Sequence, residues 1–122
     1  MRTFASHFPF YDWTDTICTI QEMTAQASDE GKFLATGTLM DIHPIGQDIY
    51  YSLADKSLVA GTAYEATLAD ETGEVKVMVL PNMLSEEELS MERLHLVSCR
   101  IEDGAPVFTI EKSALPETQL LL

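Results

Sequence analysis

The sequence predicts an all-β domain, a five-stranded Greek-key barrel with one short helix between its third and fourth strands. Apolar and polar residues alternate over most of the chain after residue 32, as they do in strands. Two turn sequences rich in Asp and Gly each join a pair of such segments. A short helix signal lies between the two pairs. A β-sandwich is the alternative, but it needs more strands than this length provides.

The composition is that of one globular domain. The chain has 122 residues, of which 46% are hydrophobic and 22% charged. Seven Lys and Arg against 20 Asp and Glu give a net charge of −13. This balance argues against an autonomous, non-specific nucleic-acid binder, because neutralising phosphates requires a surplus of cations. Cys18 and Cys99 are far apart and are typical of buried small residues in a reducing compartment.

We expect three parts along the chain: an aromatic N-terminal arm (1–15), the barrel domain (16–114) and an apolar C-terminal tail (115–122). The two ends are predicted to bind a partner, because such apolar segments would be poorly solvated alone. The residues expected to do so are Phe4, Phe8, Phe10, Tyr11, Trp13, Leu120, Leu121 and Leu122. No apolar stretch long enough for a membrane span or a secretory signal is apparent. We therefore expect an intracellular protein with no membrane partner, in the nucleus if the source is eukaryotic and otherwise in the cytoplasm.

The first strand is predicted over residues 32–42, with both faces partly covered. Gly37 in the middle of this strand is expected to destabilise it unless the strand bends there or another backbone comes close. The sequence His-Pro-Ile-Gly at 43–46 is expected to break the strand. A separate short strand is predicted at 49–53, and residues 60–61 are expected to end the following loop.

The clearest hairpin lies between residues 64 and 80. Its two strands alternate apolar and polar positions and are joined by Asp-Glu-Thr-Gly at 70–73, with Gly73 expected to adopt a positive φ. Ser85 and Glu88 form a capping-box pattern that predicts a short helix over 86–93. Its run of three glutamates is interpreted as a solvated face and not as a metal site. A second hairpin is predicted from strands at 94–101 and 107–112, with its turn at 102–106.

Over residues 17–112 the chain resembles the OB-fold modules of single-stranded-DNA-binding complexes such as replication protein A and its telomeric relatives. The resemblance rests on Gly31-Lys32-Phe33 opening the first strand, on the following Thr36-Gly37-Thr38-Leu39, and on the hairpin at 64–77 with its Asp-Glu-Thr-Gly turn. The stretch at 50–58, followed by Tyr64, is similar to the C-terminal module of the large subunit. That module carries a zinc ribbon held by paired cysteines, and this sequence has none there, so we predict no structural zinc.

The small subunit of replication protein A is also similar in its length and acidity, and that subunit works mainly as an assembly module. It normally ends in a helix that joins a bundle. This chain ends instead in Pro116 and a leucine tail.

The resemblance implies a binding face of aromatic platforms and backbone-tracking cations. The candidate nucleic-acid-binding residues are Lys32, Phe33, Tyr50, Tyr51, Lys56, Lys76, Arg100 and Lys112, with Tyr64 and Phe108 as further aromatic candidates. The alternation places Phe33 and Tyr64 more naturally in a core than on a platform. Tyr50 and Tyr51 are adjacent in a strand and point to opposite faces, so at least one should be exposed.

Three functions remain open. The first is a non-enzymatic OB-fold subunit that assembles with other proteins, OB-fold proteins among them, in a single-stranded-DNA maintenance complex. The second is direct binding of single-stranded DNA or RNA by the aromatic and basic face. The third is an acidic inhibitor that imitates nucleic acid, which needs carboxylates in rows at phosphate-like spacing. No nucleophile, phosphate-loop or zinc-hydrolase motif is present, so we expect no enzymatic activity and no cofactor.

Overall fold

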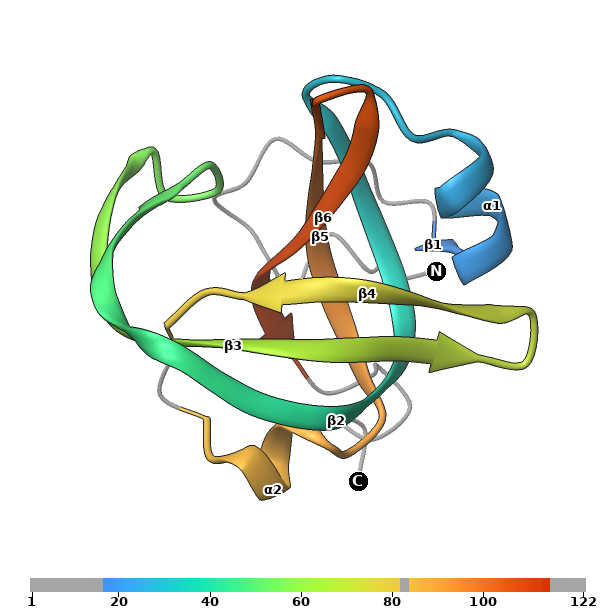
Figure 1. Ribbon diagram of the computed structural model, residues 1–122. Coiled ribbons are helices and arrows are strands. Elements are labelled where there is room, and N and C mark those ends of the chain that lie inside the picture. The colour runs from blue at the N-terminus through green and yellow to red at the C-terminus, as the bar shows by residue number, and fades with distance from the viewer. Residues whose placement is uncertain (1–16, 82–83, 115–122) are drawn as a thin grey trace, which may run out of the picture.

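The computed structural model describes residues 17–81 and 84–114, which form a closed β-barrel with two short helices at its surface (Figure 1). In chain order the elements are β1 (Ile17–Cys18), α1 (Ile20–Ala25), β2 (Gly31–Ser52), β3 (Ser57–Asp70), β4 (Gly73–Val79), α2 (Glu86–Leu89), β5 (Arg93–Glu102) and β6 (Ala105–Ala114). The sheet order is β1-β2-β3-β4-β6-β5, and an additional β2–β5 pairing closes it into a ring. The predicted Greek-key order is thus present. The sheet has six strands and not five, because the two-residue β1 pairs in parallel with β2.

β2 is one strand of 22 residues, so the prediction of two strands separated by a break at 43–46 is wrong. The reason is that β2 remains paired with β3 through two register shifts, at Met40/His43 and at Pro44/Gly46. Such bulges accommodate a proline and an extra residue without ending a strand. β3 correspondingly begins at Ser57, so residues 60–61 lie inside a strand and do not end a loop.

β2 changes its pairing partner at Gly37. Gly37 is its last residue paired with β5, opposite Arg93, and Thr38 is the first paired with β3, opposite Ala69. A Cβ atom at Gly37 would lie 2.7 Å from the Ala69 carbonyl oxygen, closer than a real side chain allows. The close backbone approach expected from a mid-strand glycine is therefore present at the corner of the barrel.

The hairpin of β3 and β4 has the predicted register, from Tyr64 opposite Val79 to Asp70 opposite Gly73. The expected positive φ at Gly73 is wrong. The turn is held by a carboxylate instead: Asp70 Oδ1 accepts hydrogen bonds from the backbone N–H groups of Thr72 (2.7 Å) and Gly73 (3.2 Å). Asp side chains commonly close turns by bonding the backbone in this way, and none of residues 70–73 has a positive φ.

The turn between β5 and β6 does use left-handed backbone. Asp103 and Gly104 have φ values of 51° and 79°, and Glu102 pairs with Ala105 on either side of them. Two successive positive φ values at Asp-Gly match the right-handed twist of the flanking strands. This turn confirms the second predicted hairpin.

The helix between β4 and β5 is present, and both halves of its capping box are formed by Ser85 and Glu88. It is a single turn and does not extend to residue 93 as predicted. Arg93 begins β5 instead, and its Nε donates to the Glu88 carbonyl at 2.7 Å, which ties helix and strand together.

The helix α1 was not predicted, although the sequence carries its capping box. Thr19 accepts a hydrogen bond from the Glu22 N–H, and the Glu22 carboxylate accepts one from the Thr19 N–H. The Ile20 N–H donates to Asp70 Oδ2 at 3.0 Å, so the turn of the β3–β4 hairpin anchors the helix. Ile20 and Met23 are buried in the core.

The interior of the barrel holds one apolar cluster, to which β2, β3, β4, β5 and β6 all contribute. A smaller cluster of Leu34, Ala54, Leu94 and Leu96 packs separately from it. Phe33 and Leu34 belong to different clusters, so β2 is covered on both faces as its sequence predicts. Cys99 is buried and Cys18 half-buried, and both are free thiols. Within the described residues, no helix is long and apolar enough to cross a membrane.

His95 is buried at 0% exposure and bonded at both ring nitrogens. Its Nε2 lies 3.2 Å from the Gly37 carbonyl and its Nδ1 lies 2.7 Å from Ser113 Oγ. A carbonyl only accepts, so Nε2 carries the proton and Nδ1 of the neutral ring accepts from the serine hydroxyl. Burial, with a smaller contribution from nearby Arg93, lowers the pKa of His95 from 6.5 to about 4.

We expect Gly37→Ala to lower the free energy of unfolding by about 1–3 kcal/mol, because the added methyl overpacks the barrel corner. Urea unfolding followed by circular dichroism measures the change. Gly73→Ala is the matched control. A Cβ there meets nothing within 4 Å and φ is not positive, so its stability should stay within about 0.5 kcal/mol of the native protein or rise slightly. Equal losses for the two variants would contradict the assignment of the corner to Gly37.

His95 should make the domain less stable as the pH falls. The pKa is lower in the folded than in the unfolded state, so the unfolded chain takes up a proton first on going from pH 6.5 to pH 4. The free energy of unfolding should fall by up to about 3 kcal/mol from this group. Urea unfolding at a series of pH values tests this. His95→Gln should flatten the slope over that window.

Candidate functional site: a latched hairpin and its groove

β2 and β3 continue together beyond the barrel as a hairpin, which we call the distal hairpin (residues 46–61). β4 pairs with β3 only from Tyr64 onward, so the distal hairpin lies beyond the end of β4. Figure 1 shows this green segment curving away from the barrel and then turning back at its tip. Gly46 and Gly61, with φ values of 123° and 145°, lie at its base on the two strands. A side chain would be strained at either position, so glycine permits the bend.

A buried carboxylate fastens the tip of the distal hairpin to the barrel. Glu111 on β6 is 5% exposed, and its Oε1 accepts hydrogen bonds from Ser52 Oγ and the Ala54 N–H, both at 3.2 Å. Its Oε2 accepts from Ser98 Oγ on β5 at 2.8 Å. A buried charge is tolerated where hydrogen bonds satisfy it, as they do here. We call this group of Glu111, Ser52, Ala54 and Ser98 the latch.

Two further contacts support the latch. Lys112 Nζ lies 2.9 Å from Asp55 Oδ2, which joins the residue after Glu111 to the turn of the hairpin. Ala54, 9% exposed, packs with Leu34, Leu94 and Leu96 from the barrel strands. Polar and apolar contacts therefore hold the tip in one place, although no strand pairing connects it to β5 or β6 among the described residues.

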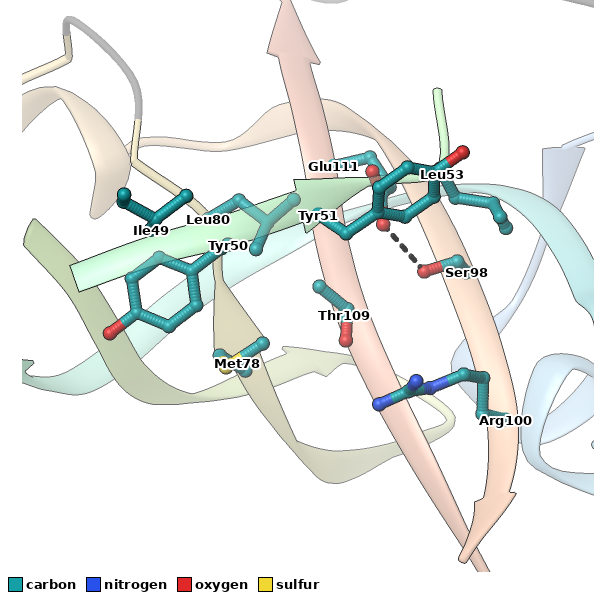
Figure 2. Close-up of a pocket in the computed structure, with 10 residues that line it drawn as sticks. All are labelled: Ile49, Tyr50, Tyr51, Leu53, Met78, Leu80, Ser98, Arg100, Thr109 and Glu111. Atoms are coloured by element: carbon teal, nitrogen blue, oxygen red, sulfur yellow. Dashed lines mark hydrogen bonds between the residues drawn. The ribbon is translucent and has the colours of Figure 1, made fainter. Parts of the chain in front are cut away.

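A groove of about 440 Å³ lies between the hairpin and the barrel (Figure 2). Its lining is mixed, and consists of Ile49, Tyr50, Tyr51 and Leu53 from the hairpin side with Met78, Leu80, Ser98, Arg100, Thr109 and Glu111 from the barrel side. Tyr50 is half-buried and its hydroxyl donates to the Gly46 carbonyl at 3.3 Å. The latch bond between Ser98 and Glu111 joins two of the residues that line this groove, as Figure 2 shows.

The charge in this groove is balanced. Among the described lining residues Arg100 is the one cation and Glu111 the one anion. Arg100 is also paired with Glu102 on its own strand, at 2.6 Å between Nη2 and Oε1. A groove of this kind attracts a polyanion weakly, because its cation is already partly neutralised.

One face of the distal hairpin, whose Ile49 and Tyr51 also line the groove, exposes large apolar side chains. Leu58 is 70% exposed, Ile49 62% and Tyr51 57%. Tyr51 and Leu58 are direct cross-strand partners, and Ile49 pairs with Ala60 two positions along. Partners across an antiparallel ladder lie on the same face, so these side chains form one stripe, which we call the apolar stripe (Ile49, Tyr51, Leu58).

The structure brings together only some of the residues predicted to bind nucleic acid. Tyr50, Tyr51 and Arg100 line the groove, and Tyr51 is exposed as the alternation requires. Lys56 lies exposed in the turn of the distal hairpin and Lys112 is paired with Asp55. Lys32 and Lys76 are exposed elsewhere on the barrel, Lys76 beside a separate polar pocket that includes His43 and Glu65.

Phe33 requires a correction. Its side chain is 6% exposed and belongs to the barrel core, so it cannot act as a stacking platform. Phe108 is likewise buried, at 3%, and Tyr64 is half-buried against the core. These rings point inward because they alternate in register with the other core positions of their strands.

The aromatic arm and the leucine tail, predicted to bind a partner, lie outside the described residues. The latch was not predicted from the sequence. Glu111 occupies an outward position at the end of a predicted strand, where an acidic residue normally meets solvent. Ser52 and Ala54, which cover it, are more than 50 positions away in the chain.

In the described part of the chain, no three His, Cys, Asp or Glu side chains gather into a group that could hold a metal ion. The one dense acidic run, residues 86–88, occupies the single-turn α2. Three other carboxylates, Asp55, Glu65 and Glu102, each lie within ion-pair distance of a basic side chain. This arrangement gives little support to imitation of nucleic acid.

Comparison with known proteins bears on the fold. The chain is similar to the OB domain of Ta0387 from Thermoplasma acidophilum, solved by NMR, with a TM-score of 0.50 and 13% sequence identity over 80% of this chain and 82% of that one. Together with the strand order, this similarity identifies the domain as an OB-fold, a fold that commonly binds nucleic acids or proteins. Neither a protein-family model nor a curated protein matches the sequence.

We expect Glu111→Ala to lower the free energy of unfolding by about 3 kcal/mol, because Ser52 Oγ, the Ala54 N–H and Ser98 Oγ lose a charged acceptor. Urea unfolding of the full chain measures this. Glu74→Gln, at an exposed position on β4, should change stability by less than about 0.5 kcal/mol. A Glu111 variant as stable as that control would show that the latch contributes nothing.

Proposed function

We propose that this OB-fold domain is a non-enzymatic, protein-binding subunit of a complex that maintains single-stranded DNA. Its partner contact is the apolar stripe of the distal hairpin. The observation that carries the proposal is the 57–70% exposure of Ile49, Tyr51 and Leu58 on one face of an ordered hairpin. Exposed apolar side chains clustered in this way are typical of protein-binding surfaces.

The latch makes the stripe suitable for recognition. Glu111 and Lys112 fix the tip of the hairpin, so little backbone freedom remains to be lost when a partner binds. Tyr51 sits in the middle of the stripe, and tyrosine is enriched among the residues that dominate binding energy at interfaces. A preorganised aromatic and aliphatic surface of this type favours a protein partner.

The type of complex follows from the sequence resemblance to the modules of replication protein A and its telomeric relatives, in which OB-folds assemble with one another. The OB-fold of this chain and its acidic composition are compatible with an assembly role in such a complex. We infer that other OB-fold subunits are the partners, and that the site of action is the nucleus if the source is eukaryotic.

A second candidate function is direct binding of single-stranded nucleic acid in the groove. It is favoured by one observation, the convergence of Tyr50 and Tyr51 of β2 with Arg100 of β5. Stacking on tyrosine contributes about 1–3 kcal/mol per base. The balanced charge of the groove and the net charge of −13 oppose it, so we place this function second.

The test is a double substitution, Tyr51→Ser with Leu58→Ser, in the full chain. Immobilised native protein should capture partner subunits from its source, and the double variant should lose at least about 90% of that capture, as removal of two interface anchors implies. Met91→Ser is the matched control, because Met91 is also exposed, at 49%, but lies outside the hairpin. Quantitative mass spectrometry of the captured proteins gives the readout.

Capture that is equal for the double variant and the Met91 control would contradict the proposal. In parallel, fluorescence anisotropy with a labelled oligonucleotide at low salt tests the second function. We expect no binding at tens of micromolar protein, and binding that is lost in a Tyr50→Ser variant would make the groove a nucleic-acid site instead.

A further inference from the structure

One edge of the distal hairpin is an unprotected strand edge. β3 pairs with β2 throughout the hairpin, but on its other edge it meets β4 only from Tyr64 onward. Among the described strands nothing pairs with that other edge over residues 57–63. Their backbone groups on this side therefore form a row of donors and acceptors that an added strand could satisfy.

The β3 edge of the distal hairpin is better suited to strand addition than the β2 edge. The β2 edge carries the charged Asp48, and Pro44 with two register shifts comes just before it, features that discourage strand addition. Residues 57–63 read Ser-Leu-Val-Ala-Gly-Thr-Ala, with no proline, charge or bulge. An extended edge without these protections accepts a strand from another chain readily.

A second groove, separate from the one between the hairpin and the barrel, runs along this edge. It is lined by residues 59–62 of β3 together with Tyr64, Pro81 and Lys112. Pro81 follows the end of β4, and a Cβ at Gly61 would lie 3.0 Å from the Pro81 side chain. This second groove therefore begins where β4 ends. A strand bound in it would pair with β3 on the same edge as β4, beyond the end of β4.

We propose that an extended segment of a partner protein pairs with residues 57–63 of β3 as an additional, backbone-bonded strand. This inference rests on the proposed protein-binding function and specifies the form of the partner. Alternate side chains of the added strand would lie on the same face as Leu58 and Ala60 and would enlarge the apolar stripe. The segment therefore has small or branched apolar residues at every second position.

The remaining side chains of the segment should be basic. The chain carries a net charge of −13, and Lys112, the cation that lines this groove, is already paired with Asp55. A second copy of this chain would bring a further net charge of −13 to the complex, so self-association through this edge is disfavoured. The overall negative charge of the chain, and not a carboxylate lining the groove, therefore favours a cationic strand over an acidic one.

The experiment titrates ¹⁵N-labelled full-length protein with three synthetic heptapeptides. The first alternates lysine and valine, the second alternates glutamate and valine, and the third is the lysine peptide with N-methyl groups on alternate backbone nitrogens along one edge. We expect the lysine peptide to shift the amide signals of residues 57–63. N-methylation should weaken its binding at least about tenfold, because the backbone hydrogen bonds are lost.

Absence of shifts at 57–63 with the lysine peptide, or equal binding of the N-methylated peptide, would overturn strand addition. Equal binding of the glutamate peptide would overturn the basic character of the partner. The Tyr51 and Leu58 double variant separates this inference from the proposed function. If the double variant loses partner capture but the lysine peptide does not bind at residues 57–63, strand addition is refuted and the role of the stripe stands. If the peptide binds there but the double variant captures as much partner as the native protein, the role of the stripe is refuted.

Discussion

At Gly37 the strand β2 stops pairing with β5 and starts pairing with β3, and this change of partner both closes the barrel and directs the rest of β2 outward. Only a residue without a side chain allows it, because the Ala69 carbonyl oxygen occupies the space that a Cβ would need. The same glycine accepts a hydrogen bond from buried His95, so the corner is also fixed from β5. The position of the distal hairpin follows from this corner.

A hairpin that leaves a small barrel must be held by something other than its own strand pairing, since a two-stranded ribbon alone is marginally stable. Here the latch provides the support. Glu111 accepts hydrogen bonds from the hairpin tip and from β5, while Ala54 packs on a small apolar cluster outside the main core. The latch and this packing thus hold the tip of the hairpin that carries the apolar stripe and the open edge of β3, which connects a buried charge to the surface proposed for recognition.

The features that the sequence predicted correctly are local ones. The register of the β3–β4 hairpin next to its turn at Asp70 and the capping box at Ser85 depend on residues a few positions apart, and both formed as expected. The continuity of β2 was missed, because a partner strand stabilises the bulges around Pro44 and the sequence of β2 alone does not show this. Burial of Glu111 was missed for the same reason: the residues that cover it come from a distant segment.

Amide hydrogen exchange of the full-length protein in solution tests most directly whether the distal hairpin is held in place. We expect slow exchange at the Ala54 N–H, whose acceptor is the buried Glu111 carboxylate, at a level close to that of the barrel amides in β5. Exchange at Ala54 as fast as in an unfolded peptide, with β5 still protected, would show that the hairpin is loose and that the latch does not hold it.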